Sequence, residues 1–193
     1  MIKQRIARFI FRAHGWKLTG GPLPEEVNRC VFLVAPHTSN WDFYYGVMCM
    51  IGWGVPIKIA IKKFWTRFPL SLLIGPLGGI GIDRAPKADG TKRNQVAVLA
   101  QVFKEYEQVA LVITPEGSRS KRTQWKTGFY YVAKAAGVPI VPLTADYPKR
   151  TIEFGPVLSA EQSLEEVMQQ LMEFYSRGIG KYPEFFSLDE RYS

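Results

Sequence analysis

The sequence is poor in the residues that usually hold metal ions or form disulfides. Among 193 residues it has only 2 histidines, His14 and His37, and 2 cysteines, Cys30 and Cys49. Neither histidine has cysteine or carboxylate neighbours at the spacing of a zinc site, and both cysteines lie in apolar runs typical of buried thiols. We therefore expect no metal, no cofactor and no disulfide, and a reducing compartment.

Long apolar runs are also lacking. The longest uncharged stretch, residues 68–82, is shorter than the ~20 residues that a membrane-spanning helix needs, and it contains Pro69, Pro76 and several glycines. This stretch predicts either a buried connection or the wall of an apolar groove, and we favour the groove. The N-terminus carries no signal peptide with a small-residue cleavage site. A spanning helix is not expected, whereas attachment to one membrane leaflet stays open.

Acidic residues are in deficit. The chain has 17 Asp and Glu against 25 Lys and Arg, a formal net charge of +8. Such an excess favours an anionic partner, which can be nucleic acid, a phosphorylated metabolite or an anionic membrane surface. No recognisable nucleic-acid motif of aromatic residues interleaved with Arg or Lys is present, so no nucleic-acid partner is expected.

The hydrophobic pattern predicts a single α/β domain. Segments of strand and helix character alternate along the chain, which favours a mostly parallel central sheet flanked by helices. Strands are expected at residues 30–34, 55–61, 109–114 and 138–144, and a final, short edge strand is expected at residues 151–154. Helices are expected at residues 1–13, 43–51, 128–136 and 163–175, and from a cap at Asp89 or Thr91 to about residue 106.

The first helix is amphipathic. Apolar side chains form one stripe with basic side chains at its flanks, namely Ile2, Ile6, Phe9, Ile10 and Ala13 with Lys3, Arg5, Arg8 and Arg12. Phe11 lies outside this stripe. The pattern fits a helix in a membrane interface with its arginines toward lipid phosphates, and equally a helix docked on the protein's own core. We expect residues 1–24 to form a membrane-associating segment and connector, and residues 25–193 to form the α/β core.

The stretch with the most chemical content follows the first expected buried strand. Residues 35–42 read Ala-Pro-His-Thr-Ser-Asn-Trp-Asp and lead into a helix that Ser39 or Asn40 can cap. His37 ends the strand, and Asp42 lies near the helix N-terminus. A carboxylate that accepts a hydrogen bond from one imidazole nitrogen leaves the other free to act as a base. The stretch predicts an acid–base pair; the alternative is a histidine satisfied at a sheet edge.

Two later stretches carry groups suited to a phosphate. Residues 78–84 are rich in glycine and end in Arg84, and an arginine can grip a phosphate with two N–H groups. Residues 114–120, Thr-Pro-Glu-Gly-Ser-Arg-Ser, follow an expected strand, and Lys126 is among the basic residues after them. A phosphate-bearing ligand suits both stretches, although a surface turn and a solvated basic loop explain them equally well.

The order and spacing of these stretches resemble the four sequence blocks of the glycerolipid and lysophospholipid acyltransferase family. The blocks are His37-x4-Asp42, Gly79-x4-Arg84, Glu116-Gly117-Ser118-Arg119 and Val138-Pro139-Ile140-Val141-Pro142. The resemblance runs from about residue 31 to residue 142, and Lys126 looks like the lysine that commonly trails the third block. The chain departs from the family pattern at Pro36, Gly81 and Ser118, where Asn, Phe and Thr are common.

The resemblance implies an O-acyltransferase that moves a fatty acyl group from acyl-CoA or acyl carrier protein to a lysophospholipid, with 1-acylglycerol-3-phosphate as the leading acceptor. His37 is expected to be the general base, and Asp42 to orient its imidazole. The acceptor's glycerol-phosphate is expected to bind Arg84, Glu116, Gly117, Ser118, Arg119 and Lys126. Residues 68–82 are expected to receive the acyl chain. The enzyme would lie at the cytoplasmic face of the membrane, peripherally or monotopically, on an anionic surface.

Two other functions fit some of the same residues. A serine hydrolase would use Ser39 or Ser118 as its nucleophile, but the sequence has no Gly-x-Ser-x-Gly elbow. A non-catalytic phospholipid-binding module would use the basic charge without the acid–base pair. Acyl transfer that depends on His37 separates the enzyme from the module.

Overall fold

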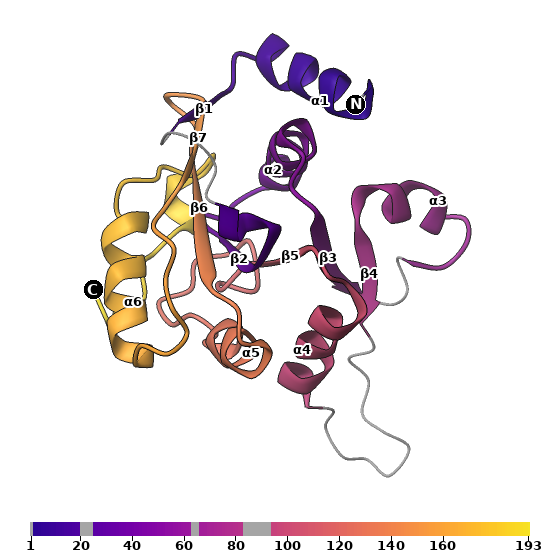
Figure 1. Ribbon diagram of the computed structural model, residues 1–193. Coiled ribbons are helices and arrows are strands. Elements are labelled where there is room, and N and C mark those ends of the chain that lie inside the picture. The colour runs from indigo at the N-terminus through magenta and orange to yellow at the C-terminus, as the bar shows by residue number, and fades with distance from the viewer. Residues whose placement is uncertain (1, 20–24, 63–65, 83–93) are drawn as a thin grey trace.

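The structure, a computed structural model, describes residues 2–19, 25–62, 66–82 and 94–193. Seven strands form one sheet in the order β1-β7-β6-β2-β5-β3-β4 (Figure 1). Neighbouring strands are parallel except β6 and β7, which are antiparallel. The strands are β1 Lys17–Thr19, β2 Arg29–Val34, β3 Ile57–Lys62, β4 Gly79–Ile82, β5 Val109–Ile113, β6 Ile140–Asp146 and β7 Thr151–Phe154.

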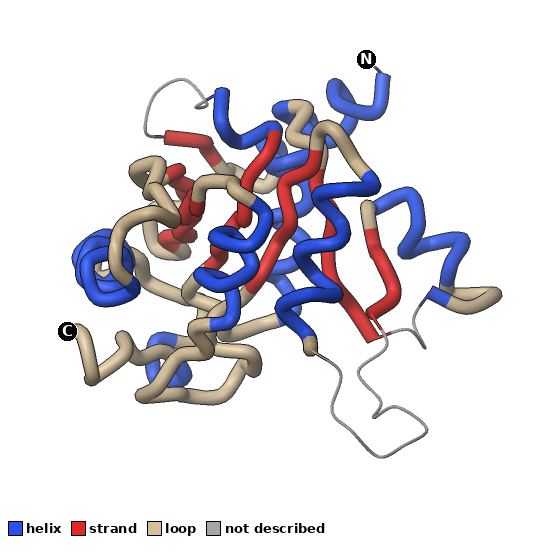
Figure 2. Tube along the Cα trace, turned by 60° about the horizontal axis from the view of Figure 1, so that its bottom comes forward, coloured by secondary structure: helices blue, strands red, loops and turns tan. Residues whose placement is uncertain are grey.

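Helices cover both faces of this sheet, which confirms the α/β prediction. The helices α1 and α2 pack on one face and α4, α5 and α6 on the other, so the strands run as a layer between them (Figure 2). The α-helices are α1 Ile2–Ala13, α2 Asn40–Trp53, α3 Ser71–Ile74, α4 Gln95–Glu105, α5 Gly128–Ala136 and α6 Leu164–Tyr175. Short 3-10 helices are η1 Glu25–Asn28, η3 Gly75–Leu77 and η4 Pro183–Phe185.

The central strand β2 explains why its sequence is continuously apolar. Val31 and Leu33 point into the core formed with α4, α5 and α6, while Cys30 and Phe32 point into the core formed with α1 and α2. All four side chains are fully buried. Because successive side chains of a strand alternate between faces, a strand covered on both sides has no polar face to show.

The helix signals in the sequence act where they were expected. Ser39 is the N-cap of α2 and its hydroxyl accepts from the backbone N–H of Trp41. Ser163 and Glu166 form a reciprocal capping box at the start of α6. Gly137 ends α5 in the left-handed conformation, with φ of 63°. These helix predictions are confirmed. They were possible from sequence because the start and stop signals act between neighbouring residues.

Three details of the predicted element list were wrong. The helix α4 begins at Gln95 with Asn94 as its N-cap, and the expected caps Asp89 and Thr91 lie outside the described residues. The stretch 68–82 contains the strand β4, which its glycines and short length concealed. The expected connector contains the strand β1, which pairs with β7. The strand β7 is therefore not at the sheet edge as predicted.

The helix α1 docks on α2, but through the side opposite its apolar stripe. Phe11 and Ala7 are buried, and the Phe11 ring lies edge-on to Trp53 with centroids 5.5 Å apart. By contrast Ile2 and Phe9 are 76% and 73% exposed. The helix thus packs against the protein, as one of the two arrangements requires, and presents its apolar stripe outward. Its position in a membrane interface stays a prediction.

No helix among the described residues has the length and apolar character needed to cross a membrane. The expected division between residues 24 and 25 stays a prediction.

Candidate active site

The turn between β2 and α2 brings His37 and Asp42 together at the C-terminal edge of the sheet. The strands β5 and β6 flank β2 in parallel register, so the segments that follow all three strands meet at this edge. The nearest approach is 3.5 Å, between His37 Nδ1 and Asp42 Oδ2. The pair predicted from sequence spacing is therefore a pair in space.

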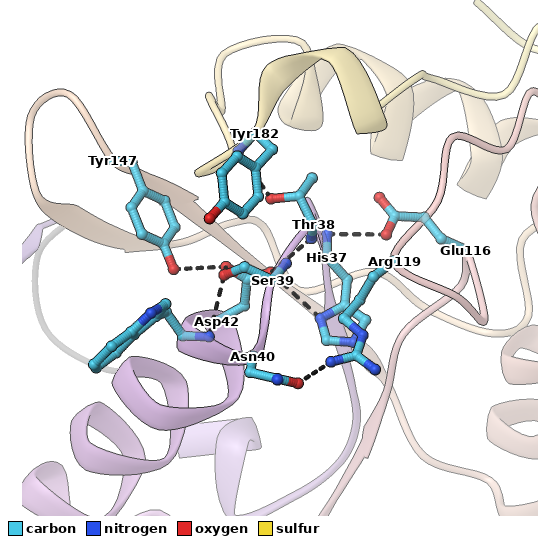
Figure 3. Close-up of polar contacts among 10 residues, drawn as sticks. His37, Thr38, Ser39, Asn40, Asp42, Glu116, Arg119, Tyr147 and Tyr182 are labelled. Carbon is cyan, nitrogen blue, oxygen red and sulfur yellow. Dashed lines mark hydrogen bonds and ion pairs between the residues drawn. The ribbon is translucent and has the colours of Figure 1, made fainter.

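The carboxylate of Asp42 is held by donors on both oxygens (Figure 3). Its Oδ2 accepts from the backbone N–H groups of Thr38 at 2.6 Å and Ser39 at 2.7 Å. Its Oδ1 accepts from the hydroxyl of Ser39 at 3.1 Å and that of Tyr147 at 2.6 Å. Burial opposes ionisation, but these hydrogen bonds and the one from His37 outweigh it and hold the pKa of Asp42 below its ordinary value. The group is a fixed carboxylate at neutral pH.

The imidazole of His37 is oriented by this carboxylate and stays accessible. Its side chain is 22% exposed and lines a cavity of about 730 Å³. Because Nδ1 faces Asp42, the other ring nitrogen, Nε2, is free to face a ligand. A neutral imidazole in this tautomer is suited to accept a proton at Nε2.

Glu116 lies beneath the turn rather than on the exposed side of its loop. Only 5% of the residue is exposed, and its Oε2 accepts from the backbone N–H of His37 at 2.9 Å. Among the described residues no group bonds its other oxygen, Oε1. Burial raises the pKa of Glu116 to about 8, and the nearby charge of Asp42 adds to the effect. Glu116 therefore contacts the backbone of the candidate base.

The remaining loop residues are mostly on the surface. The Arg119 guanidinium donates to the side-chain oxygen of Asn40 at the start of α2, which places it beside the turn (Figure 3). Gly117 has φ of 67°, and its N–H donates to Thr114 at 3.2 Å rather than pointing to a ligand. A Cβ on Gly117 would lie 2.7 Å from Lys126 Nζ, so the lysine side chain passes over this glycine.

Of the predicted ligand-binding residues, one contacts only its own loop and one lies outside the described residues. The hydroxyl of Ser118 contacts the carbonyl of Ser120 at 3.2 Å and accepts from Arg122 Nε at 3.1 Å, so it is engaged within its own loop. Arg84 lies outside the described residues. The structure thus brings His37, Asp42, Glu116, Arg119 and the Gly117–Lys126 contact to one place.

An apolar cavity of about 730 Å³ opens at the His37–Asp42 pair. Its walls come from α2, β3, β5, α4 and α5, and include Val47, Met50, Ile59, Ile61, Leu99, Val112 and Phe129. No described residue of the stretch 68–82 lines it. Instead Phe68 and Leu72 are exposed at 81% and 71%. The groove was therefore predicted in the wrong segment, because the walls come from elements that are distant in sequence.

A comparison with known protein families shows the family of this chain. Residues 21–146 match the Acyltransferase family. The chain belongs to that family. It is also 27% identical over 126 residues to the 1-acyl-sn-glycerol-3-phosphate acyltransferase of Haemophilus influenzae, an alignment that covers 62% of this chain and 48% of that relative. This chain thus spans about half the length of the curated relative that it matches.

The fold of this acyltransferase is similar to a solved structure. The crystal structure of PlsC, the 1-acyl-sn-glycerophosphate acyltransferase of Thermotoga maritima, superposes with a TM-score of 0.59 and 15% sequence identity. The match covers 92% of this chain and 80% of that one. At this identity the likeness concerns the fold alone.

Sequence reasoning missed Tyr147, whose hydroxyl reaches Asp42 from the segment after β6. Burial and the Asp42 carboxylate raise the pKa of Tyr147 far above its ordinary value, so the hydroxyl stays a donor. Its position at the C-terminal end of a parallel strand was the available signal, because such ends converge. The predicted strand ended at residue 144, short of this tyrosine.

The site does not suit the hydrolase alternative. Ser39 is buried and engaged in capping α2, and Ser118 is engaged within its loop. Across the part of the chain that the structure describes, neither hydroxyl hydrogen-bonds His37. The described residues also contain no cluster of His, Cys, Asp or Glu suited to a metal ion.

Proposed function

We propose that this acyltransferase moves a fatty acyl group from an acyl thioester to the hydroxyl of a lysophospholipid, with 1-acylglycerol-3-phosphate as the leading acceptor and phosphatidate as the product. The observation that carries the proposal is an oriented histidine at the opening of a large apolar cavity, with exposed cations beside it. The acceptor assignment is supported by the name of the Haemophilus influenzae relative.

His37 would act as general base in a direct transfer. Its Nε2 takes the proton of the acceptor hydroxyl while the oxygen attacks the thioester carbonyl carbon. The tetrahedral intermediate then collapses with cleavage of the C–S bond, and the imidazolium returns the proton to the departing thiolate. The products are the new ester and a free thiol. Asp42 keeps the imidazole in the required tautomer and stabilises the imidazolium, and the hydrogen bond of Tyr147 fixes Asp42.

Arg119 and Lys126 would hold the acceptor's phosphate. Both are exposed cations, and Arg119 is already turned toward the start of α2 by its bond to Asn40. A guanidinium binds phosphate through paired N–H groups and so fixes its orientation. The benefit is positioning, because a bound phosphate brings the acceptor hydroxyl to His37. Glu116 contributes by holding the His37 backbone, and the role of Arg84 stays a prediction.

The apolar cavity would receive the acyl chain. Its volume of about 730 Å³ falls within the range of about 300–1,000 Å³ that is usual for small-ligand pockets. Most of its wall residues are aliphatic or aromatic, which suits a hydrocarbon chain. His37 and Asp42 line the same cavity, so a chain seated there would place its thioester next to the base.

The exposed apolar face of α1 would attach the enzyme to the cytoplasmic face of a membrane. Ile2, Ile6 and Phe9 point outward beside basic residues, the pattern of a helix lying in the interface of an anionic bilayer. Lys3 Nζ donates to the carbonyl of Pro76 at 2.6 Å, so the start of α1 lies next to the segment that carries the exposed Phe68 and Leu72. Together these residues would keep the site at the surface that supplies lysophospholipid.

The test measures transfer of a radiolabelled acyl group to a panel of lysolipids in anionic vesicles, with acyl-CoA and acyl carrier protein thioesters as alternative donors. We expect a diacyl product with the wild type and a loss of about 10²–10⁴-fold in His37→Ala. Vesicle binding and thermal unfolding serve as controls and should not change. Vesicle binding without transfer by the wild type would instead establish the non-catalytic phospholipid-binding module.

A further inference from the structure

A second pocket, of about 630 Å³, lies beside the candidate active site and shares no lining residue with the apolar cavity. The end of α1, the start of α2, the turn after β6 and the segment after α6 form its walls. We call it the aromatic pocket, and the side chains that matter here are Trp16, Trp41, Tyr45, Tyr147, Arg150 and Lys181. Neither the family match nor the acyl-transfer mechanism above assigns it a role.

The aromatic rings of this pocket form a stack that ends at Trp41. Tyr45 stacks on Trp16 with centroids 4.5 Å apart, and on Trp41 with centroids 5.8 Å apart. Trp16 is buried, whereas Trp41 is 46% exposed. The stack therefore ends in an indole whose outer side is accessible. A large apolar ring is costly to leave in water, and an exposed ring face can accept another planar group.

The polar groups of the pocket are cationic. Lys181 Nζ lies 5.0 Å from the centre of the Trp41 ring, and the Arg150 guanidinium rests on the His14 carbonyl at 3.3 Å. Among the described residues no carboxylate lines the pocket, and no ion pair engages Lys181 or Arg150. Such a field repels a quaternary ammonium group and attracts an anion, so the pocket suits a ligand that is both planar and phosphorylated.

The pocket is connected directly to the candidate active site. Tyr147 lines it with its ring and donates its hydroxyl to Asp42 (Figure 3). Trp41 immediately precedes Asp42 in α2. A ligand in the pocket therefore lies next to the residues that orient His37, and a flexible arm from it can reach the imidazole across the start of α2.

We propose that the aromatic pocket binds the nucleoside phosphate end of the thioester donor. The nucleobase stacks on the exposed indole of Trp41 in place of the Lys181 ammonium, and Lys181 and Arg150 bind the phosphates. This inference rests on the proposed function, because it requires a thioester donor that carries a nucleotide. The acyl end of the same donor occupies the apolar cavity.

The first experiment compares two donors that differ only in the nucleotide, acyl-CoA and the corresponding acyl-pantetheine. In Lys181→Ala and Arg150→Asn we expect KM for acyl-CoA to rise about tenfold, with a change below about twofold for acyl-pantetheine. Asparagine is chosen at Arg150 because its φ of 51° is left-handed, which asparagine tolerates. Lys104→Ala, an exposed lysine on α4, is the matched control and should leave both values unchanged. An equal rise for both donors would overturn the proposal.

The second experiment measures binding without turnover, by titrating adenosine 3′,5′-bisphosphate and following tryptophan fluorescence. We expect saturable binding that weakens about tenfold in both variants and persists in His37→Ala. Thermal unfolding identifies a variant that has failed to fold. Absence of saturable binding, or equal affinity in the folded variants, would overturn the proposal.

The two proposals fail separately. If the wild type transfers acyl groups but the nucleotide neither binds nor affects KM, the aromatic pocket is wrongly assigned and the transferase stands. If the nucleotide binds and depends on Lys181 while no donor supports transfer, the pocket stands and the proposed reaction fails. Glycerol 3-phosphate is titrated in parallel, and binding as tight as that of the nucleotide would point to a lipid headgroup and overturn the assignment.

Discussion

The His37–Asp42 turn and the Gly117–Lys126 loop lie side by side, but they are built differently. Thr38, Ser39 and Asp42 are buried, and both oxygens of Asp42 accept hydrogen bonds. In the loop Arg119 and Lys126 are exposed, and Arg119 has one hydrogen-bond partner among the described residues, Asn40. Buried hydrogen bonds fix the turn, whereas the cations of the loop are exposed and have few hydrogen bonds among the described residues.

This difference matches what each region would have to do. Proton transfer depends on distances accurate to a fraction of an ångström, so a base needs neighbours that leave its orientation no freedom. Phosphate binding depends on charge, and flexible cations can close on the ligand when it arrives. We therefore expect substitutions in the turn to lower kcat and substitutions in the loop to raise KM.

The largest effect is expected at the carboxylate. Asp42→Asn removes the charge that stabilises the imidazolium and places an amide where the backbone N–H groups of Thr38 and Ser39 need an acceptor. We expect kcat to fall about 10²–10⁴-fold with little change in KM for the acceptor. Steady-state kinetics at neutral pH measure this, with circular dichroism to confirm folding. A folded variant that retains wild-type kcat would remove Asp42 from the mechanism.

Loss of the loop guanidinium should act on binding. Arg119→Ala is expected to raise KM for the lysophospholipid about tenfold or more while kcat changes only a few-fold. Lys121→Ala is the matched control, because Lys121 is an exposed cation of the same loop. If both variants raise KM equally, the loop attracts the acceptor by net charge alone and Arg119 has no specific role.

Removal of the Tyr147 hydroxyl is expected to have a smaller effect. Tyr147→Phe removes one donor to Asp42, so kcat should fall about tenfold. Because that bond helps to hold the pKa of Asp42 down, its loss raises this pKa, and the titration profile of the Asp42 carboxyl, followed by NMR, moves to higher pH. Tyr182→Phe is the control, since Tyr182 hydrogen-bonds the turn through its backbone N–H, at Thr38, which the substitution keeps. An unshifted profile would contradict the positioning role.

Glu116 belongs to the loop in sequence but to the turn in packing, and its substitution should affect stability more than turnover. With a folded pKa of about 8 against an ordinary value of 4.5, the folded protein binds the proton more tightly than the unfolded chain. This contribution to stability is complete below about pH 4.5 and is lost as pH rises through about 8.

Glu116→Gln keeps an acceptor for the His37 N–H and removes the titration. Urea unfolding at several pH values should therefore give a smaller decline in stability toward alkaline pH than in the wild type, with kcat near neutral pH within a few-fold. Parallel pH curves for the two proteins would show that Glu116 is ionised in the folded state.

Local patterns predicted much of the fold. The buried strands β2, β5 and β6 are continuous apolar runs, and α2, α5 and α6 have caps that act within one helical turn, so neighbouring residues suffice to predict them. The strands β1 and β4 were missed because one has 3 residues and the other is half glycine. Each is a strand because it pairs with a neighbouring strand, β1 with β7 and β4 with β3, and such pairing is not visible within the short segment itself.

The candidate site divides in the same way. The spacing of His37 and Asp42 and the Glu116–Arg119 sequence identified the principal residues. Tyr147, the cavity walls and the place of Glu116 beneath the turn depend on which strands become neighbours. Contacts between residues about 80 to 100 positions apart leave no periodic trace in a single sequence.

The helix α1 shows which properties the sequence predicts and which depend on tertiary packing. The sequence by itself determined a helix with an apolar stripe and basic flanks, because this depends only on the 3.6-residue period. The tertiary structure alone decided that Phe11 and Ala7 pack on α2 while Ile2, Ile6 and Phe9 face outward. The physical reason is that amphipathicity defines two faces, whereas burial depends on the shape of the surface that receives one of them.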